Sequence, residues 1–260
     1  MTLTTSTPCG SILEVLRGER AERPPRDTET ATGLRAILED GLAEVSDRFS
    51  RTSPLVITAA NVVRHADAID IARAPIGRLR GALVAQLVRL IAVGHRSDNA
   101  FDDALRAWRV DRPSRELRST LDDLDADGRA RLATEVSAHA ATLARALATV
   151  PAAWSVRTAL RSRLPLAGGA VVLSDVIDLV IGNSTESTAS TVLVDVTTSP
   201  IGTSAARLMR YHALVHTLRT SVTPWRVAMF STATGELASD DVDVTVLGAA
   251  VDDVLMVVRR

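Results

Sequence analysis

The spacing of apolar residues changes near residue 150, and this change constrains the fold more than any other feature of the chain. Before Pro151, apolar residues recur every three or four positions, which is typical of amphipathic helices. After Pro151, residues 170–181 and 191–196 are long apolar runs that predict strands, the second of them buried on both faces. Gly168-Gly169 predicts a hairpin turn just before the first run. The sequence therefore predicts an α/β fold with a helical N-terminal half.

This pattern divides the chain into three segments. Residues 1–32 are polar and are expected to form a mobile tail with one short helix at 12–16. Residues 33–150 predict a helical region, and residues 151–260 predict a mixed sheet with its own helices. The expected helices are 34–49, 60–71, 77–91, 101–108, 117–124, 127–149, 200–219 and 242–258. The expected strands are 155–164, 170–181, 191–196 and 226–231, while 55–57 fits either a strand or the entry to a helix.

The charged residues are balanced and include no lysine. The chain has 30 basic and 31 acidic residues, and every basic residue is an arginine. A nearly neutral chain has no global field that attracts nucleic acid or membrane. Any contact with nucleic acid must therefore come from a local group of arginines.

The composition also bears on the compartment. The single Cys9 excludes an internal disulfide and a multi-cysteine metal site, and it fits a reducing cytoplasm. The first ten residues lack the basic start and apolar core of a signal peptide. The longest apolar stretch, residues 82–93, contains Gln86 and Arg89 and is shorter than the ~20 residues of a membrane span. We therefore expect a soluble cytoplasmic protein without a membrane partner.

Several motifs in the second half of the chain follow a recognisable order. Trp154 precedes the first predicted strand, and Asp178 lies in the apolar strand after Gly168-Gly169. The motifs that follow are Val194-Asp195-Val196-Thr197-Thr198, then Leu208-Met209-Arg210-Tyr211-His212-Ala213-Leu214, then Pro224-Trp225-Arg226-Val227-Ala228-Met229-Phe230 with Gly235. In this order the chain resembles the RecB-type branch of the PD-(D/E)XK nuclease superfamily, and especially an actinobacterial group of uncharacterised proteins.

The resemblance implies a metal site in which some of the catalytic residues are replaced. In the superfamily, two carboxylates hold a Mg²⁺ that activates water against a phosphodiester, and a nearby lysine orients that water. The resemblance assigns these carboxylates to Asp178 and Asp195, as catalytic and metal-binding residues that are vestigial or weak. Thr197 stands at the lysine position, and the chain has no lysine to replace it. The other changed positions are Ala159 for a glutamate, Arg80 or Gly81 for a histidine, and Arg207 for a glutamine.

Arginines beside these motifs are candidate nucleic-acid contacts. Arg157, Arg161 and Arg163 follow the polar side of the first predicted strand. The helix after Asp195 carries a second group, Arg207, Arg210 and Arg219, together with Tyr211 of the motif. If both groups face one cleft, they form a stripe that binds phosphates. Ordinary solvated arginines are the alternative interpretation.

Other polar residues of this region are interpreted as structural. Asp175 is three residues before Asp178, so strand alternation places it on the opposite face, away from the same metal. His212 and His216 are four residues apart on one helix, without an HExxH pattern, which favours surface or packing roles. If Asp178 and Asp195 are remnants, we expect an arginine partner or hydrogen bonds, because a buried unpaired carboxylate is costly.

These features favour a catalytically degenerate PD-(D/E)XK-like protein that acts as a DNA-binding or scaffolding subunit in DNA repair or defence. Such a protein needs no cofactor, and its partners are DNA and another protein. One alternative is a divergent Mg²⁺-dependent DNA nuclease that uses Asp178 and Asp195. A second alternative is a protein-interaction module without a nucleic-acid role, which the nearly neutral charge favours.

Overall fold

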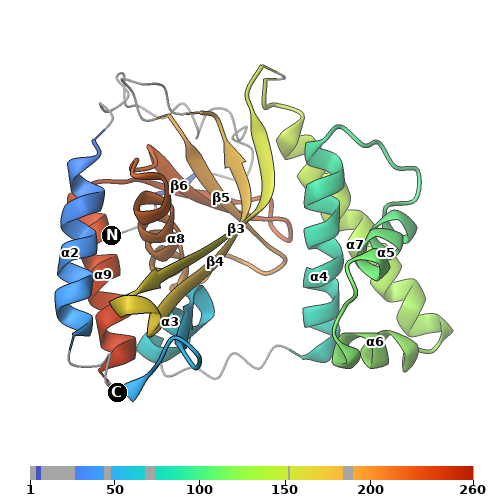
Figure 1. Ribbon diagram of the computed structural model, residues 1–260. Coiled ribbons are helices and arrows are strands. Elements are labelled where there is room, and N and C mark those ends of the chain that lie inside the picture. Colours follow the sequence, from blue (N-terminus) through green and yellow to red (C-terminus); the bar gives the residue numbers. More distant parts are fainter. Residues whose placement is uncertain are drawn as a thin grey trace.

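A mixed sheet with a layer of helices on each side forms the molecule (Figure 1). The computed structural model describes residues 4–6, 27–43, 48–67, 74–151, 153–183 and 190–259. The α/β class predicted from the sequence is confirmed in these ranges. No helix within them is long and apolar enough to cross a membrane.

The sheet contains seven strands in the described part of the chain. Their order is β1-β7-β6-β5-β4-β2, and β3 pairs with β4 along its other edge. Two neighbouring pairs are parallel, β2 with β4 and β5 with β6, and the remaining pairs are antiparallel. The strands are β1 (Thr4–Ser6), β2 (Leu55–Thr58), β3 (Val156–Leu166), β4 (Val171–Ile181), β5 (Val192–Thr197), β6 (Arg226–Ser231) and β7 (Leu237–Asp241).

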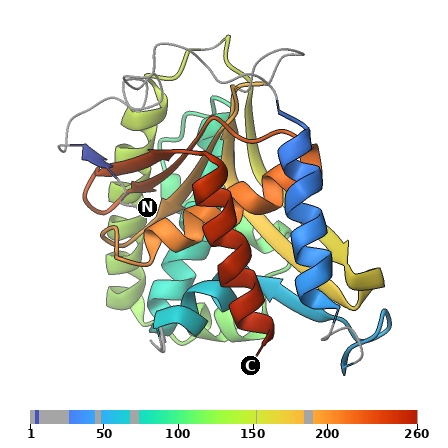
Figure 2. The same ribbon diagram turned by 90° about the vertical axis from the view of Figure 1, so that its left-hand side faces the viewer.

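One face of the sheet is covered by four helices from both ends of the chain. They are α2 (Glu29–Leu42), α3 (Ala59–Asp67), α8 (Ala205–Thr220) and α9 (Val244–Val258). Figure 2 shows α2 and α9 side by side over α8. Leu38 of α2, Leu173 of β4 and Leu247 of α9 are fully buried in this core. We call this the α8-side core.

The other face is covered by four consecutive helices, seen on the right of Figure 1. They are α4 (Pro75–Ala92), α5 (Ala100–Val110), α6 (Arg115–Asp122) and α7 (Ala126–Leu147). Leu83 of α4, Leu143 of α7 and Val194 of β5 are fully buried between these helices and the sheet. We call this the α4-side core.

Side-chain caps set where several of these helices begin. Asn99, Ser114 and Asp125 accept hydrogen bonds from backbone N–H groups in the first turns of α5, α6 and α7, and Asp243 does the same for α9. Such caps satisfy N–H groups that have no partner within the helix. Asp125, one of several acidic residues near the start of α7, is therefore explained by helix capping.

Most predicted elements occur near their expected bounds, but the N-terminal half was divided wrongly. Residues 55–58 form strand β2, which pairs in parallel with β4, and α2 packs against α9. The predicted boundary at residue 150 therefore does not separate two cores, because both halves of the chain contribute residues to each core. Long-range pairing of this kind leaves no local sequence signal.

The expected tail also contains ordered elements. β1 pairs with β7, and α2 already begins at Glu29. Neither β1 nor β7 was predicted, because β1 has three residues and β7 (Leu237–Asp241) ends in polar ones. The short helix expected at residues 12–16 lies outside the described residues, as do the expected helical residues 68–71.

Strand β4 changes partner along its length. Val171 to Ser174 pair with β2, whereas Leu179 to Ile181 pair with β5 on the same edge. Residues 175–178 between them pair only with β3 among the described strands, and we call this stretch the sheet fork. Tyr211 of α8 holds the β2 side of the fork, because its hydroxyl donates to Ile57 O at 2.7 Å and to Ser174 O at 3.2 Å.

Removing this hydroxyl should destabilise the protein. Tyr211→Phe leaves two buried carbonyl oxygens without their donor, and such a loss costs about 1–3 kcal/mol. Urea unfolding followed by circular dichroism would measure the change in the free energy of unfolding. Thr134→Val is the control, because it removes an exposed hydroxyl that bonds within α7 and should change stability by less than about 0.5 kcal/mol. Equal stabilities for wild type and Tyr211→Phe would contradict this role.

Candidate functional site

Asp178 and Asp195 lie opposite each other at the sheet fork. The ladder between β4 and β5 ends at Leu179 and Val194, and the two aspartates are the next residues of these strands. The Val196 N–H donates to Asp178 Oδ2 at 2.9 Å, and the two carboxyl groups are close enough to shift each other's pKa. The fold therefore brings together the two carboxylates singled out by the sequence.

The backbone is unusual beside Asp178. Ala159, which lies opposite Asp178 on β3, has a φ of 49°, and positive φ is uncommon for a residue with a side chain. Ile177 packs into the α8-side core but Leu179 packs into the α4-side core, so the strand changes faces at Asp178. Strained backbone of this kind often occurs at functional sites. The glutamate of the superfamily was expected near Ala159, whose methyl group cannot bind a metal.

His212 of α8 and Asp175 of β4 form the inner wall of the site. His212 Nδ1 lies 2.9 Å and 2.8 Å from the two carboxylate oxygens of Asp175, and both side chains are almost fully buried. His212 Nε2 lies 4.0 Å from Asp195 Oδ1 and has no hydrogen-bond partner among the described atoms. Asp175 was not expected to take part in this site, but His212 connects it to the carboxylate pair.

The sequence missed the role of His212. It was interpreted as a surface or packing residue, yet it is 3% exposed and is the closest basic group that the structure places beside Asp195. The only available signal was its position next to Tyr211 in a motif helix, and that signal does not show that the imidazole faces β4. This contact depends on how α8 packs on the sheet.

Burial and mutual charge shift the pKa values of this group. Burial raises the pKa of Asp195 well above its usual value, and repulsion by Asp178 raises it further, while His212 acts against both. The pKa of Asp178 is also raised by burial, and the Val196 N–H bond partly offsets this. Burial alone would lower the pKa of His212, but the charges of Asp175, Asp195 and Asp178 outweigh it and raise the pKa to about 9. His212 is therefore the natural cation of the cluster at neutral pH.

The carboxylate pair matches part of what a Mg²⁺ site requires. Mg²⁺ commonly takes one or two protein carboxylates and fills its other positions with water or substrate phosphates. Asp178 and Asp195 could supply those two carboxylates. In the described ranges, no group of three or more His, Cys, Asp and Glu side chains is arranged to hold a metal ion.

Thr197 occupies the position expected for the lysine, at the end of β5. Its carbonyl oxygen accepts hydrogen bonds from the N–H and the hydroxyl of Thr232, both at 2.9 Å. Its own hydroxyl accepts one from the Ser199 N–H at 3.2 Å. The residue therefore ties β5 to the β6–β7 turn and supplies no charge to the carboxylate pair.

Three of the residues predicted to contact nucleic acid bind other residues of the protein instead. Arg207 Nε and Arg210 Nε bind the two carboxylate oxygens of Asp253 on α9, at 3.2 Å and 2.5 Å. Tyr211 is 1% exposed and bonds to the backbone of β2 and β4. The prediction that Tyr211 contacts nucleic acid is thus wrong, because its ring lies in the core. Arg207 and Arg210 hold α8 against α9 and do not face the carboxylate pair as a free arginine group.

The arginines of β3 are exposed but lie on two faces. Arg157 pairs with Val180 of the α8-side core, and its charge contributes to lowering the pKa of the buried His216 to about 4, after the larger effect of burial. Arg161 and Arg163 point to the opposite face, because Ser162 and Leu164 between them are buried. The predicted single stripe of β3 and α8 arginines is therefore not formed. Arg161 and Arg163 are called the arginine row below.

The face of the sheet that carries the arginine row is exposed to solvent and includes part of the sheet fork. Val176 of β4, which pairs with Arg161, is 44% exposed, and Val56 of β2 is 39% exposed. The pKa of Asp111 at the end of α5 is lowered by hydrogen bonds from Gln86 and Arg89 and, more weakly, by the charge of Arg161. The row therefore faces the layer of helices α4 to α7.

Arg89 of α4 is a further cation near the site. Its charge contributes to lowering the pKa of Asp178, against the dominant effect of burial. Its guanidinium is bound to Asp111 at 2.5 Å, and Gln86 binds the same carboxylate oxygen at 3.1 Å. Arg89 is thus fixed within its own layer and influences the carboxylate pair from a distance.

The chain was also compared with known proteins. No protein-family model matches it, and no curated protein sequence matches it.

The elevated pKa of His212 gives a prediction for stability. A base whose pKa rises from 6.5 to about 9 on folding stabilises the protein fully below pH 6.5, and this contribution disappears as the pH rises through 9. The free energy of unfolding should fall by about 3 kcal/mol over this window, at 1.36 kcal/mol per pKa unit. His212→Gln should remove most of this fall, whereas His95→Gln, a change at an exposed histidine, should keep it. Denaturant unfolding at several pH values would measure both, and an unchanged fall in His212→Gln would refute the assignment.

Proposed function

We propose that this protein is a nuclease-like DNA-binding or scaffolding subunit that does not cleave its ligand. The observation that carries the proposal is the arrangement of the arginine row. Arg161 and Arg163 lie on an exposed face of β3, the strand that pairs with β4 on either side of Asp178. A buried histidine, His212, lies next to the carboxylate pair. This arrangement favours binding of a phosphate backbone over catalysis.

The charges around the carboxylate pair support the absence of cleavage. Hydrolysis would require a group that orients or activates water beside the pair, and Thr197 offers no such group. Arg207 and Arg210 are bound to Asp253, and Arg89 is bound to Asp111. A guanidinium also stays protonated at all relevant pH values, so it is a poor proton-transfer group. The nearest compensating charge is instead His212, which Asp175 holds from its other side.

The geometry of the arginine row supports contact with a phosphate backbone. Residues two apart on a strand are separated by about 6.8 Å. This distance corresponds to about two nucleotide steps along the axis of a duplex strand. Guanidinium groups bind phosphates through parallel N–H donors. Because the chain is nearly neutral overall, this local row is the feature that would direct nucleic acid to the fork.

Binding to DNA should depend on the arginine row and on salt. Loss of two phosphate contacts in Arg161→Ala with Arg163→Ala should lower the slope of log K against log salt by about 2 and weaken binding about tenfold or more at low salt. Fluorescence anisotropy with duplex and single-stranded DNA over a salt series would measure this. Arg118→Ala with Arg129→Ala, two exposed arginines of α6 and α7, is the matched control and should bind like wild type. Absence of salt-dependent binding to either DNA would overturn the DNA-binding role.

A divergent Mg²⁺-dependent nuclease is the second candidate, and the opposed carboxylates favour it. Asp178 and Asp195 face each other at the fork, and the charge of Asp178 adds to burial in raising the pKa of Asp195, so a cation between them would relieve this repulsion. Bound there, Mg²⁺ would polarise a phosphodiester and activate water. The chain's own residues would hold the ion and, through the arginine row, the backbone.

Cleavage assays separate the two candidates. The second candidate predicts Mg²⁺- or Mn²⁺-dependent cleavage of DNA that Asp195→Asn abolishes, since this change removes one charged oxygen while keeping the side-chain shape. Asp98→Asn, at an exposed residue of the loop before α5, is the control and should cleave normally. The first candidate predicts no metal-dependent products from wild type, with DNA binding intact. Cleavage lost only in Asp195→Asn would therefore replace the first candidate by the second.

A further inference from the structure

A groove separate from the sheet fork lies between α4 and α7. It has a volume of about 1190 Å³ and is bounded by the last turns of α4, residues 93–98, one side of α7 and residues 150–156. Pockets for small ligands are typically about 300–1,000 Å³ and mostly apolar, with a few polar groups that orient the ligand. The groove is thus large enough for an elongated molecule.

The walls of the groove are apolar and leave room along α7. Leu87 forms part of the floor, Ile91 lies on the α4 wall, and Trp154 and Val156 line the end next to β3. The α7 wall consists mainly of small residues, including the exposed Ala141, Ala144 and Ala148. Val93 at the rim is 77% exposed and extends the apolar surface of the groove.

The polar groups of the groove are mostly basic. Arg96 and Arg145 both line it, and Asp98 is the acidic residue of the lining. His95 also lines it, and its Nε2 lies 2.9 Å from Asp103 Oδ2. Arg145 makes one long hydrogen bond, to Thr142 at 3.4 Å, and both guanidinium groups are exposed. Two guanidinium groups against one carboxylate favour a ligand with a negative head group.

We propose that the α4–α7 groove binds an anionic amphiphile, a free small molecule with an elongated apolar body and a carboxylate or phosphate head. The apolar body lies between Leu87 and Ile91 on one side and Ala144 and Ala148 on the other. The head group is bound by Arg96 and Arg145. This site uses none of the residues of the sheet fork, so it is independent of the proposed function.

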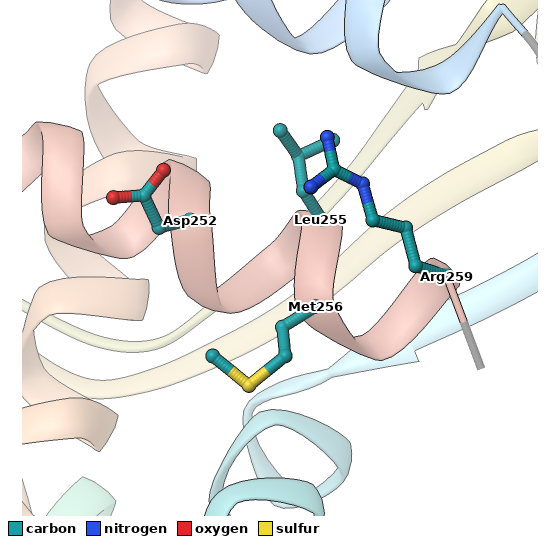
Figure 3. A pocket seen from close by; sticks show the side chains of 4 residues that line it. All are labelled: Asp252, Leu255, Met256 and Arg259. Carbon is teal, nitrogen blue, oxygen red and sulfur yellow. The ribbon is translucent and has the colours of Figure 1, made fainter.

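A smaller hollow on α9 is a weaker candidate for a ligand site because of the residues that line it. It has a volume of about 460 Å³ and is lined by Asp252, Leu255, Met256 and Arg259. These side chains come from α9 alone, where Asp252 lies near the middle of the helix and Arg259 follows its last turn (Figure 3). Its one arginine is accompanied by one carboxylate, so this hollow lacks the excess of guanidinium groups found in the α4–α7 groove.

Titration calorimetry with simple amphiphiles tests the proposal. Dodecanoate, used below its micelle-forming concentration, should bind one site per chain. Dodecyltrimethylammonium has the same chain with the opposite charge and should bind at least tenfold more weakly, and acetate, a head group alone, should not bind. No binding of dodecanoate up to millimolar concentration, or equal affinity for the two amphiphiles, would overturn the proposal.

Two variants locate the site. Ala144→Trp fills the groove and should weaken dodecanoate binding at least tenfold, whereas Ala138→Trp, on α7 but outside the groove lining, should leave it unchanged. Thermal melts would show whether both variants fold. If Ala144→Trp does not fold, Arg96→Glu with Arg145→Glu decides, because it should reverse the preference towards the cationic amphiphile. Unchanged binding in a folded Ala144→Trp variant, or unchanged preference in the charge variant, would place any binding elsewhere.

Discussion

The change of partner along β4 is the constraint on which the candidate site depends. A strand with neighbours on both edges usually has its polar groups taken up by ladders, but residues 175–178 have β3 alone among the described strands. This interruption gives Asp178 and Asp195 room to face each other, and it allows Asp178 to accept the Val196 N–H. Tyr211 holds the other side of the gap through Ile57 and Ser174. The site therefore rests on a local break in an otherwise continuous sheet.

The break in the sheet contains buried carboxylates, and groups inside the protein reduce the electrostatic cost of burying them. Burying carboxylates is unfavourable unless they are paired or hydrogen-bonded. Here Asp178 accepts a hydrogen bond from the Val196 N–H, and His212 lies between Asp195 and Asp175. The arginine partner expected for remnant carboxylates is thus replaced by a buried histidine held by a third aspartate.

The two helical layers have different relations to the sheet. On the α8 side, Arg207 and Arg210 are used to join α8 to α9 through Asp253. On the α4 side, Arg161 and Arg163 remain exposed, and the helices beside them also form the α4–α7 groove. Both proposed binding surfaces therefore involve the α4–α7 layer, while the α8 layer mainly stabilises the fold.

The sequence by itself determined the α/β class and most helix and strand positions, because these follow from the period of apolar residues, a local property of the chain. The pairing of Asp178 with Asp195 was expected only from the resemblance of their motifs to a known superfamily, and the sheet places the two residues opposite each other. Only the tertiary structure decided that β2 joins the sheet, that His212 faces Asp175, and that Arg207 and Arg210 bind Asp253. Each of these depends on contacts between residues more than 35 positions apart, set by helix packing and strand register. Local patterns show which side chains can bind a ligand, but packing decides which of them are left free to do so.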